Sequence, residues 1–378
     1  MTTPAGADAA DRSNLTELEI SALDAGINVA DGHARQELTL SQQKIIDDLP
    51  SLFEQASRTS ATALDRAAQV AFFSALGQHE ALARATALTC YSSSVAMEIL
   101  ARTLRSQGTT RIALIHPTFD NIPDILLGFG MVLSPVSENQ LLTGPGDGFG
   151  EADVLFVTTP NNPTGFVLPD RQLARWGSWC AARRMTLVLD TSFRGFDNRA
   201  QYDHYAVLAE AGCQYVIIED TGKLWPTLDL KAGFLVFTKE QLALRRIYTD
   251  IMIGVSPLIL ALIRRFSEEA SQGGLAELHQ FIGQNRALLR AGLAEVTSLS
   301  FPDPESRTSV ERIALGADQN ASRLWSDLRG TGVHLLPCSQ FHWDDPAAGE
   351  RFIRVALARP ARSVALAAAA IRQHLTGS

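Results

Sequence analysis

The sequence has no closely spaced cysteines and no hydrophobic run long enough to span a membrane. Its four cysteines are scattered and form no C-x-x-C pair, so neither a zinc knuckle nor a disulfide framework is indicated. We expect reduced, buried thiols in a cytoplasmic protein. The longest uncharged apolar run, residues 251–263, has 13 residues, whereas a membrane-spanning helix takes about 20. We therefore interpret this run as a buried helix and expect no membrane partner.

An excess of basic residues is also missing. There are 33 lysines and arginines against 41 aspartates and glutamates, which gives a net charge of −8. Because no basic cluster follows one face, we expect no nucleic-acid partner. Residues 1–14 contain no apolar stretch, so we expect no secretory signal there. At 378 residues with 46% hydrophobic side chains, the chain is long enough for about two domains with sizeable cores.

Short, β-rich apolar runs alternate with amphipathic stretches such as residues 169–184. Continuous apolar strands separated by helices predict an α/β fold, in which a parallel sheet is covered on both faces. In sheets of this kind, ligands bind at the carboxyl ends of the strands. The predicted strands are residues 111–117, 153–160, 186–192, 215–220 and 233–237.

Three of these strands lead into a polar residue. Asn162 follows the second strand, Asp190 lies near the end of the third and Lys223 follows the fourth. A buried lysine or carboxylate needs a partner or a task, because burial disfavours the charged form. Taken singly, Asn162 could belong to a plain loop, and Asp190 could be a helix cap or part of a structural ion pair. Together, the three residues predict one shared site.

Pyridoxal phosphate is a cofactor that needs this combination. It requires a lysine amine for its Schiff base, here Lys223, and an acid that keeps its pyridine nitrogen protonated, here Asp190. Asn162 can donate a hydrogen bond to its phenolic oxygen. Its phosphate needs an anion site, and Ser93 and Ser94 lie where an amphipathic helix begins, whose N-terminus suits an anion. The serine run alone would be interpreted as a simple helix cap.

With these residues in this order, the chain resembles the fold-type I pyridoxal-phosphate enzymes of the class I/II aminotransferase superfamily. The segments "NPTG" at 162–165 and "DTSF" at 190–193 match two of its motifs. The resemblance implies a mainly parallel central sheet with helices on both faces, a smaller α+β domain and a homodimer. By motif match it assigns the cofactor lysine (Lys223), the phosphate ligand (Lys231), the ring-stacking aromatic (Phe119) and the carboxylate-binding arginine (Arg354).

We expect three parts along the chain. Residues 1–44 would form an N-terminal lid helix and arm, and residues 45–270 a large pyridoxal-phosphate-binding domain. Residues 271–378 would form a small C-terminal domain.

Three positions depart from the superfamily pattern. Lys231 stands where arginine is usual, and it supplies a point charge rather than a bidentate contact. Phe193 lacks the hydroxyl that many aminotransferases direct at the phenolic oxygen. Asp220 replaces a serine that usually contacts the phosphate. Because a phosphate would repel a carboxylate, we expect Asp220 to point elsewhere, toward the substrate side chain.

At finer detail the chain resembles the pyridoxal-phosphate-dependent L-arginine oxidases, which include L-arginine 4-hydroxylases of natural-product biosynthesis. Segments that carry this resemblance include "NVADGHARQ" at 28–36 and "IEDTGKLWPTLDLKAG" at 218–233. It implies an O2-consuming reaction in which L-arginine loses its α-amine as ammonia. The implied products are 4-hydroxy-2-ketoarginine and 2-ketoarginine.

A guanidinium substrate needs carboxylates arranged around it. The candidates are Asp220, Asp31 and Glu19, with Thr16 as a weaker polar contact. In the resembled subfamily an N-terminal helix closes over the site, which would place these N-terminal residues and His33 there. Without the resemblance, Glu19 would be interpreted as part of a solvated helix face, Asp31 as a turn residue and His33 as a capping or packing histidine. We expect no metal site.

Our hypothesis for His33 is that it assists the chemistry distant from Lys223, either as a base or by holding the lid closed. The main alternative function is an aminotransferase that acts on arginine or a related basic amino acid. It would keep Lys223, Asp190 and Arg354 and would need a keto-acid acceptor, but Asp220 and the segment 31–35 argue against it. A regulator that senses an amino acid would need a DNA-binding domain, for which we see no room.

Overall fold

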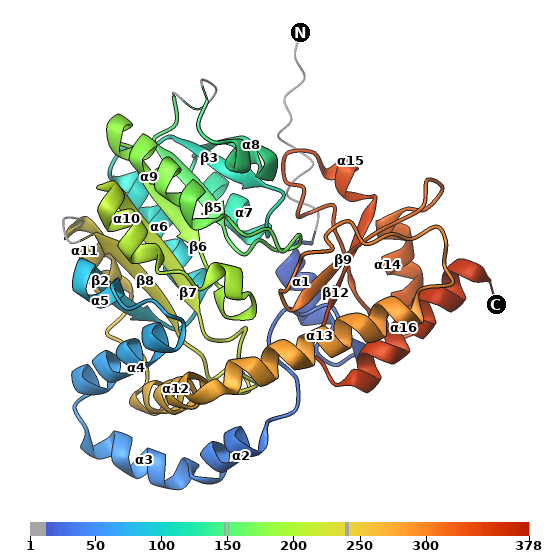
Figure 1. The fold of residues 1–378 in the computed structure, drawn as a ribbon, viewed down its shortest axis with the longest axis horizontal. Coiled ribbons are helices and arrows are strands. Elements are labelled where there is room, and N and C mark those ends of the chain that lie inside the picture. The colour runs from blue at the N-terminus through green and yellow to red at the C-terminus, as the bar shows by residue number, and fades with distance from the viewer. Residues whose placement is uncertain (1–12, 147–148, 150, 239–241, 378) are drawn as a thin grey trace.

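A seven-stranded sheet forms the centre of the larger lobe in the computed structural model of this chain (Figure 1). The structure describes residues 13–146, 149, 151–238 and 242–377. The strand order across the sheet is β2-β8-β7-β6-β5-β3-β4. The strands are β2 (Ala85–Cys90), β3 (Arg111–His116), β4 (Val132–Ser137), β5 (Val154–Thr158), β6 (Thr186–Asp190), β7 (Gln214–Asp220) and β8 (Gly233–Thr238).

All five predicted strands are confirmed, as β3 and β5 to β8, with ends that differ by one or two residues. The sequence pattern missed β2 and β4. β4 lies at the edge of the sheet, is largely exposed and contains Pro135, which is tolerated on an edge strand because one side of its backbone is free. β2 alternates alanine and threonine with only one large aliphatic residue, so its apolar signal is weak.

The sheet is mainly parallel, as predicted, but β8 runs antiparallel to both β7 and β2. β7 and β8 are joined by residues 221–232, which contain no helix that could carry the chain back to the starting edge. A direct connection of this kind joins antiparallel neighbours. As a result, Lys223 and Lys231 both lie on the loop that leaves the carboxyl end of β7.

Helices lie on both faces of the sheet (Figure 1). α9 illustrates why: Leu173, Trp176 and Cys180 recur at helical spacing and are fully buried, while the arginines of the same helix are exposed. Helices of this lobe are α5 (Ala81–Arg84), α6 (Ser93–Ser106), α7 (Asn121–Gly128), α8 (Glu138–Thr143), α9 (Asp170–Arg183), α10 (His204–Ala211) and α11 (Leu242–Ile251), with short 3-10 helices at Arg194–Phe196 and Asn198–Ala200.

The smaller lobe is built on a three-stranded antiparallel sheet of order β11-β12-β9. α13 runs from the larger lobe to the smaller one and packs beside α16 (Figure 1). The boundary we predicted at residues 270/271 stays a prediction. The elements are β9 (Val310–Ala314), β11 (Leu336–Pro337), β12 (Phe352–Ala356), α13 (Leu275–Gly292), α14 (Ala321–Gly330), α15 (Pro346–Gly349) and α16 (Ala361–Thr376).

The N-terminal segment joins the two lobes. Strand β1 (Ile27–Asn28) pairs with β10 (Val333–His334) of the smaller lobe. α1 (Leu15–Ser21) packs its apolar face on Leu336, Cys338 and Phe341. Residues 1–12 of the predicted arm lie outside the described residues. The chain then returns to the larger lobe, where α2 (Leu40–Asp47), α3 (Leu49–Arg58) and α4 (Ala61–Ala75) contact α12 (Pro257–Glu269).

The prediction of one buried helix over residues 251–263 is wrong in its first half. Ile251 ends α11, Ile253 is fully exposed, and α12 begins only at Pro257. Proline is accepted in the first turn of a helix but not in its interior, so Pro257 marks a start rather than a continuation. None of the helices in the described residues is long and apolar enough to cross a membrane. All four cysteines lie within the described residues, and each is buried and free, as expected.

A buried ion pair holds the loop after β6 to strand β7. Arg194 Nη2 donates to Glu219 Oε1 over 2.8 Å, and the Tyr205 hydroxyl donates to the same oxygen over 3.1 Å. Arg194 and Glu219 are 0% and 1% exposed. Because neighbouring strand residues point to opposite faces, Glu219 faces this core while Asp220 faces the other side of the sheet.

Removing one partner of this pair leaves the other charge buried without compensation. Glu219→Ala should therefore lower the free energy of unfolding by about 3–5 kcal/mol. Denaturant unfolding at fixed protein and cofactor concentrations measures the loss. The matched control is Glu210→Ala on the exposed surface of α10, which should change stability by no more than about 0.5 kcal/mol. Equal effects of the two variants would contradict this account.

Candidate active site

A pocket of about 250 Å³ opens at the carboxyl ends of β5, β6 and β7, where the sequence predicted a site. Twelve of the thirteen predicted site residues line it, and the exception is Asp31. The predicted residues that line it are Thr16, Glu19, His33, Ser93, Ser94, Phe119, Asn162, Asp190, Asp220, Lys223, Lys231 and Arg354, and they are joined by Gly32, Ser92, Asn121, Thr158, Ser192 and Phe193.

Lys223 and Asp190 differ in how they are held. Asp190 Oδ1 accepts hydrogen bonds from the Ser192 backbone (2.9 Å) and hydroxyl (2.6 Å). Burial raises the pKa of Asp190 to about 6 despite these bonds, with Asp220 adding to the rise and Lys223 opposing it. Within the described residues, no hydrogen bond engages the Lys223 amine. The pocket therefore offers one amine that is free to react and one carboxylate that a nearby cation would stabilise.

The N-terminus of α6 lies against the start of β8. Ser92 caps the helix by accepting from the Val95 N–H, and Ser93 is its first residue. A Cβ at Gly233 would lie 2.5 Å from the Ser92 carbonyl carbon and 2.7 Å from Ser93 N. Only glycine permits this approach, which brings the first amides of α6 into the pocket. A helix N-terminus in this position suits an anion such as a phosphate.

Asp220 does not point away from this anion site, which corrects the first part of our expectation, while its contact with the substrate side chain stays a prediction. Its carboxylate accepts from the Ser93 hydroxyl over 2.6 Å and from the Gly222 N–H over 2.6 Å. Burial alone would raise the pKa of Asp220, but Lys223, Lys231 and the Ser93 hydrogen bond lower it overall. The Asp220 carboxylate therefore lies at the N-terminus of α6, beside the donors that suit an anion.

Asp31 lies beside the pocket lining rather than in it, and its contact with a guanidinium stays a prediction. Its Oδ1 pairs with His33 Nδ1 over 2.7 Å and its Oδ2 pairs with Arg35 Nε over 2.7 Å, while Arg359 lies 3.5 Å away. Burial alone would raise the pKa of Asp31, but His33 and Arg359 hold it far below the ordinary range. Both carboxylate oxygens are engaged, so Asp31 holds neighbouring side chains in place and does not reach the pocket.

His33 and Lys231 continue this network. His33 Nε2 lies 2.8 Å from Lys231 Nζ, which is also 3.3 Å from Asp229 Oδ1. Asp229 Oδ2 lies 3.7 Å from Arg35 Nη2, which closes a ring of five side chains. The ring ties the segment 31–35 to the loop 221–232. Both nitrogens of His33 are engaged, which suits the lid-holding half of our hypothesis better than the role of a free base.

Glu19 and Arg354 meet over the pocket from opposite elements, α1 and β12. Glu19 Oε1 lies 3.1 Å from Arg354 Nη2 and accepts from the Gly32 N–H over 3.2 Å. Arg354 is fully buried and also donates to the Ala30 carbonyl. The two partners come from sequence positions 335 residues apart, so the closed position of α1 completes the pocket.

Asp120 anchors α1 in that position. Its Oδ2 accepts from the Leu15 N–H, the first of the helix, over 2.6 Å, and Asp120 is 4% exposed. Its neighbours Phe119 and Asn121 both line the pocket, and Asn121 donates to the Ser94 hydroxyl over 3.3 Å. Asp120, Asn121 and Ser192 were not among the predicted site residues. Ser192 could have been predicted, because a serine two residues after an aspartate often donates a hydrogen bond to the aspartate carboxylate.

The residues of the pocket fit pyridoxal phosphate. The free amine of Lys223 suits the aldehyde, and Asp190, whose pKa burial raises to about 6, suits a protonated pyridine nitrogen. The α6 N-terminus, Ser93 and Lys231 suit the phosphate. Arg354 Nε is buried and has no hydrogen-bond partner within the described residues, so the pocket also retains a free donor for a carboxylate.

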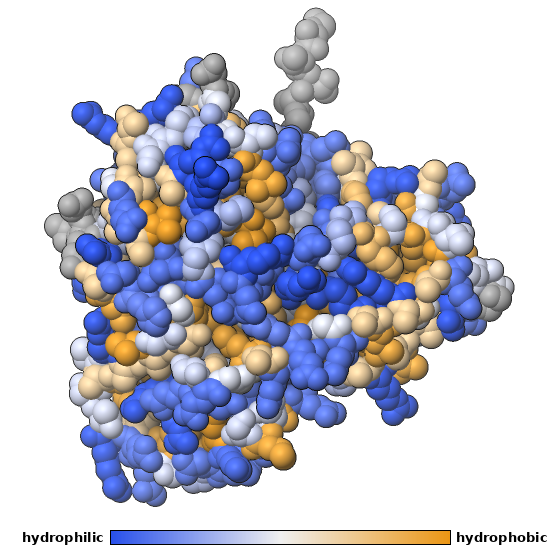
Figure 2. All heavy atoms as spheres, viewed as in Figure 1, coloured by the Kyte–Doolittle hydropathy of each residue, from blue (hydrophilic) through white to orange (hydrophobic). Residues whose placement is uncertain are grey.

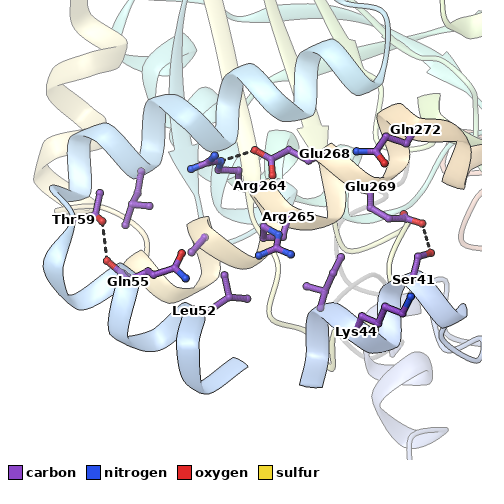
Figure 3. A pocket seen from close by; sticks show the side chains of 14 residues that line it. Ser41, Lys44, Leu52, Gln55, Thr59, Arg264, Arg265, Glu268, Glu269 and Gln272 are labelled. Atoms are coloured by element: carbon purple, nitrogen blue, oxygen red, sulfur yellow. Dashed lines mark hydrogen bonds and ion pairs between the residues drawn. The ribbon is translucent and has the colours of Figure 1, made fainter. Parts of the chain in front are cut away.

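A second hollow lies between α2, α3, α4 and α12 (Figure 3). In it Arg264 pairs with Glu268 over 2.6 Å, and the Ser41 hydroxyl donates to Glu269 over 2.6 Å. None of the described residues that line it belongs to a strand. Figure 2 shows hydrophilic side chains gathered where the two lobes meet, on the face that it presents. The strand-end pocket is therefore the better candidate for chemistry.

Comparison with known proteins gives one family. The family model described as aminotransferase class I and II matches residues 25–371. The solved structure of MppP soaked with the product 2-ketoarginine is 51% identical, with a TM-score of 0.90, over 92% of this chain and 99% of that chain. A PLP-bound putative aminotransferase from Clostridium difficile 630 has a TM-score of 0.78 at 14% identity, over 97% of each chain, which shows the fold alone.

Among curated proteins, the valine–pyruvate aminotransferase of Mycobacterium tuberculosis is 26% identical over 276 residues, which is 67% of this chain and 66% of that protein. The histidinol-phosphate aminotransferase of Paramagnetospirillum magneticum is 30% identical over 119 residues, 31% of this chain and 32% of that protein. The chain thus spans less than two thirds of the length of these curated relatives.

The contact between Asp120 and α1 predicts that closure of α1 depends on pH. The pKa of Asp120 is raised from 3.8 to about 7, first by burial and then by the nearby carboxylates of Asp124 and Glu19, against hydrogen bonds from the backbone of Leu15 and Asn121. An open lid would expose Asp120 and return its pKa toward 3.8. Closure therefore takes up a proton. Protonation of Asp120 therefore stabilises the closed position of α1. This stabilisation is fully present below pH 3.8 and is lost as the pH rises through about 7.

The measurement is the rate of proteolysis within α1, compared with Asp120→Asn at each pH so that the pH dependence of the protease cancels. Asparagine keeps the carbonyl that accepts from Leu15 but cannot ionise. The wild-type rate relative to this variant should rise roughly tenfold or more from pH 5 to pH 8. A ratio that stays constant would contradict the prediction.

Proposed function

We propose a function from one established premise: the chain belongs to the aminotransferase class I and II family. Within it, the chain oxidises L-arginine with pyridoxal phosphate and O2, releases ammonia, and gives 4-hydroxy-2-ketoarginine and 2-ketoarginine. The observation that carries this proposal is the 51% identity, over 92% of the chain, to a protein whose product is 2-ketoarginine. A homodimer, a cytoplasmic location and a place in natural-product biosynthesis complete the proposal, and they rest on the resemblance alone.

When bound, pyridoxal phosphate supplies an aldehyde that takes up an amine and a ring that accepts the electrons left when a proton leaves Cα. Lys223 would hold the aldehyde and move the proton at Cα. Asp190, anchored by Ser192, would keep the pyridine nitrogen protonated. The other cofactor contacts would come from Ser93, Ser94, Lys231, Phe119 and Asn162.

The substrate would be bound at both ends. Arg354 would take the α-carboxylate, and its orphaned Nε donor supports this role. Glu19 and Asp220 would accept from the guanidinium, with Thr16 beside them, because buried carboxylates select a cation. Asp31 would act indirectly, by fixing His33 and Arg35. The packing of α1 on Phe341 would exclude water from the pocket while Glu19 covers it.

The test is to add L-arginine to the purified holoenzyme without any keto acid and to follow O2 consumption, ammonia and product masses. We expect O2 to be consumed and both keto acids to appear. Turnover that requires an added keto acid would instead identify an aminotransferase acting on arginine or a related basic amino acid. That second candidate is favoured by the family model and by the curated relatives.

Lys223→Ala is the matched inactive variant in this test. Without the amine, the protein should lose the visible absorption of a lysine-bound cofactor, and turnover should fall by several orders of magnitude. Absorption spectra and O2 consumption measure the two effects. Undiminished turnover in Lys223→Ala would show that Lys223 is not the cofactor lysine.

His33 is expected to influence the steps distant from Cα. In His33→Ala, the ring that joins Asp31 to Lys231 is lost, and the segment 31–35 loosens over the pocket. O2 use should continue, while 2-ketoarginine replaces most of the 4-hydroxy product. Mass spectrometry of the product mixture gives the ratio, with the exposed His79→Ala as control. An unchanged ratio would remove His33 from the chemistry.

A further inference from the structure

A groove of about 720 Å³ lies at the junction of the two lobes, and among the described residues it shares no lining with the strand-end pocket. Its walls come from the 3-10 helices after β6, from the linking helix α13 and from the loop before β9. Hydrophilic side chains gather where the lobes meet in Figure 2. We call it the basic groove after the four arginines that line it, Arg199, Arg286, Arg290 and Arg307.

Small residues of α13 keep the basic groove open. Gly283 and Ala287 both line it, lie four residues apart on the same face of the helix, and are exposed. A Cβ added at Gly283 would meet no described atom within 4 Å outside its own stretch of helix. The space beside this face of α13 is therefore accessible to a ligand, and a larger side chain at position 283 would fill it.

The deep end of the groove carries an excess of positive charge, because Arg286 and Arg290 share one carboxylate. Arg286 Nε lies 2.6 Å from Glu311 Oε2, and Arg290 Nη2 lies 2.6 Å from Glu311 Oε1. Burial lowers the pKa of Arg286 despite Glu311, and the like charges of Arg290 and Arg307 lower it further. An anion bound beside these arginines would therefore be stabilised.

Arg286 presents a fixed donor to the groove. Its side chain is 7% exposed, and its Nε and Nη2 are engaged by Glu311 and by the carbonyls of Thr308 and Val310. Within the described residues, no hydrogen bond engages its Nη1. A guanidinium held in this way cannot turn to other acceptors, so Nη1 stays on the groove wall.

Arg199 and Arg307 form the rim of the groove from opposite lobes. Arg199 Nε and Nη2 donate to the buried Asp197, and its Nη1 lies 4.0 Å from Glu305 Oε2. Arg307 Nη2 also lies 4.0 Å from Glu305, which is 76% exposed. Because an exposed ion pair at this distance contributes little, a multivalent anion can take the place of Glu305 between the two arginines.

We propose that the basic groove binds a diphosphate group, either as the free anion or as part of a small molecule. Guanidinium groups donate paired N–H bonds to phosphate oxygens, and several arginines can share one such group. A monocarboxylate offers only two oxygens and one charge to four arginines. The volume of about 720 Å³ admits a molecule larger than diphosphate itself. Since the arginines belong to both lobes and to α13, the bound anion would hold the lobes together.

The experiment measures binding of pyrophosphate by calorimetry at constant ionic strength. The holoenzyme is used so that the cofactor phosphate already fills the proposed site at the α6 N-terminus. Arg307→Gln removes a rim cation, and Gly283→Leu fills the groove without changing a charge, so each should weaken binding about tenfold or more. The matched control is Arg323→Gln, an arginine of α14 that is 85% exposed and lies outside the groove, and it should bind as wild type does.

Glu305→Gln tests the sign of the effect. It removes the exposed carboxylate that lies 4.0 Å from each rim arginine, so pyrophosphate should bind severalfold more tightly. Pyrophosphate should also raise the unfolding temperature of the wild-type holoenzyme and of Arg323→Gln, but not that of Gly283→Leu. A purely structural role of the arginines would produce neither result.

Two further probes identify the chemistry of the ligand. ADP carries the same diphosphate group: binding comparable to that of pyrophosphate supports a phosphorylated small molecule, and much weaker binding supports the free anion. Citrate, a tricarboxylate, should bind more weakly than pyrophosphate. The proposal is overturned if wild type binds pyrophosphate no better than Gly283→Leu does, if Arg323→Gln weakens binding as much as Arg307→Gln, or if citrate binds more tightly than pyrophosphate.

Discussion

The active-site pocket depends on one constraint, which is that its many charges are buried and must be balanced. Arg354, Asp220 and Glu19 are each at least nine-tenths buried, and such groups persist only when opposite charges or hydrogen bonds surround them. The N-terminal segment supplies a large part of this balance: Glu19 neutralises Arg354, and His33 contacts Lys231. The same contacts therefore hold the N-terminal segment over the pocket and balance the charges of the pocket.

The fold prepares this arrangement by bringing distant parts of the chain to one edge of the sheet. Parallel strands end on the same side, so Asp190 and the loop that carries Lys223 meet although they are far apart in sequence. The antiparallel β8 adds the second lysine on the same loop and brings Gly233 against the α6 N-terminus. The smaller lobe supplies Arg354 from β12. Each lobe thus holds only part of the site.

The sequence could predict the parts of this site that follow from local pattern. Apolar runs identified five of the seven strands of the large sheet, and the strand-end rule identified Asn162, Asp190 and Lys223. It could not predict which partner a charged residue chooses across the fold. Asp31 was expected to face the substrate, but Arg359, 328 residues away, and His33 hold it outside the pocket. Asp220 was expected to avoid the anion site, yet it takes the donors there. The antiparallel direction of β8 could not be predicted either. Parallel strands were predicted from the helices between them, and no helix lies between β7 and β8.

The burial of the four cysteines has a consequence for the proposed reaction with O2. Such an enzyme works beside reduced oxygen species, which attack the thiolate form of cysteine rather than the thiol. Burial raises the pKa of Cys90, Cys180, Cys213 and Cys338 to about 12 each. Near neutral pH the thiolate fraction of such a group is on the order of one in 100,000. The four cysteines would therefore offer almost no thiolate to the oxidant of the proposed reaction.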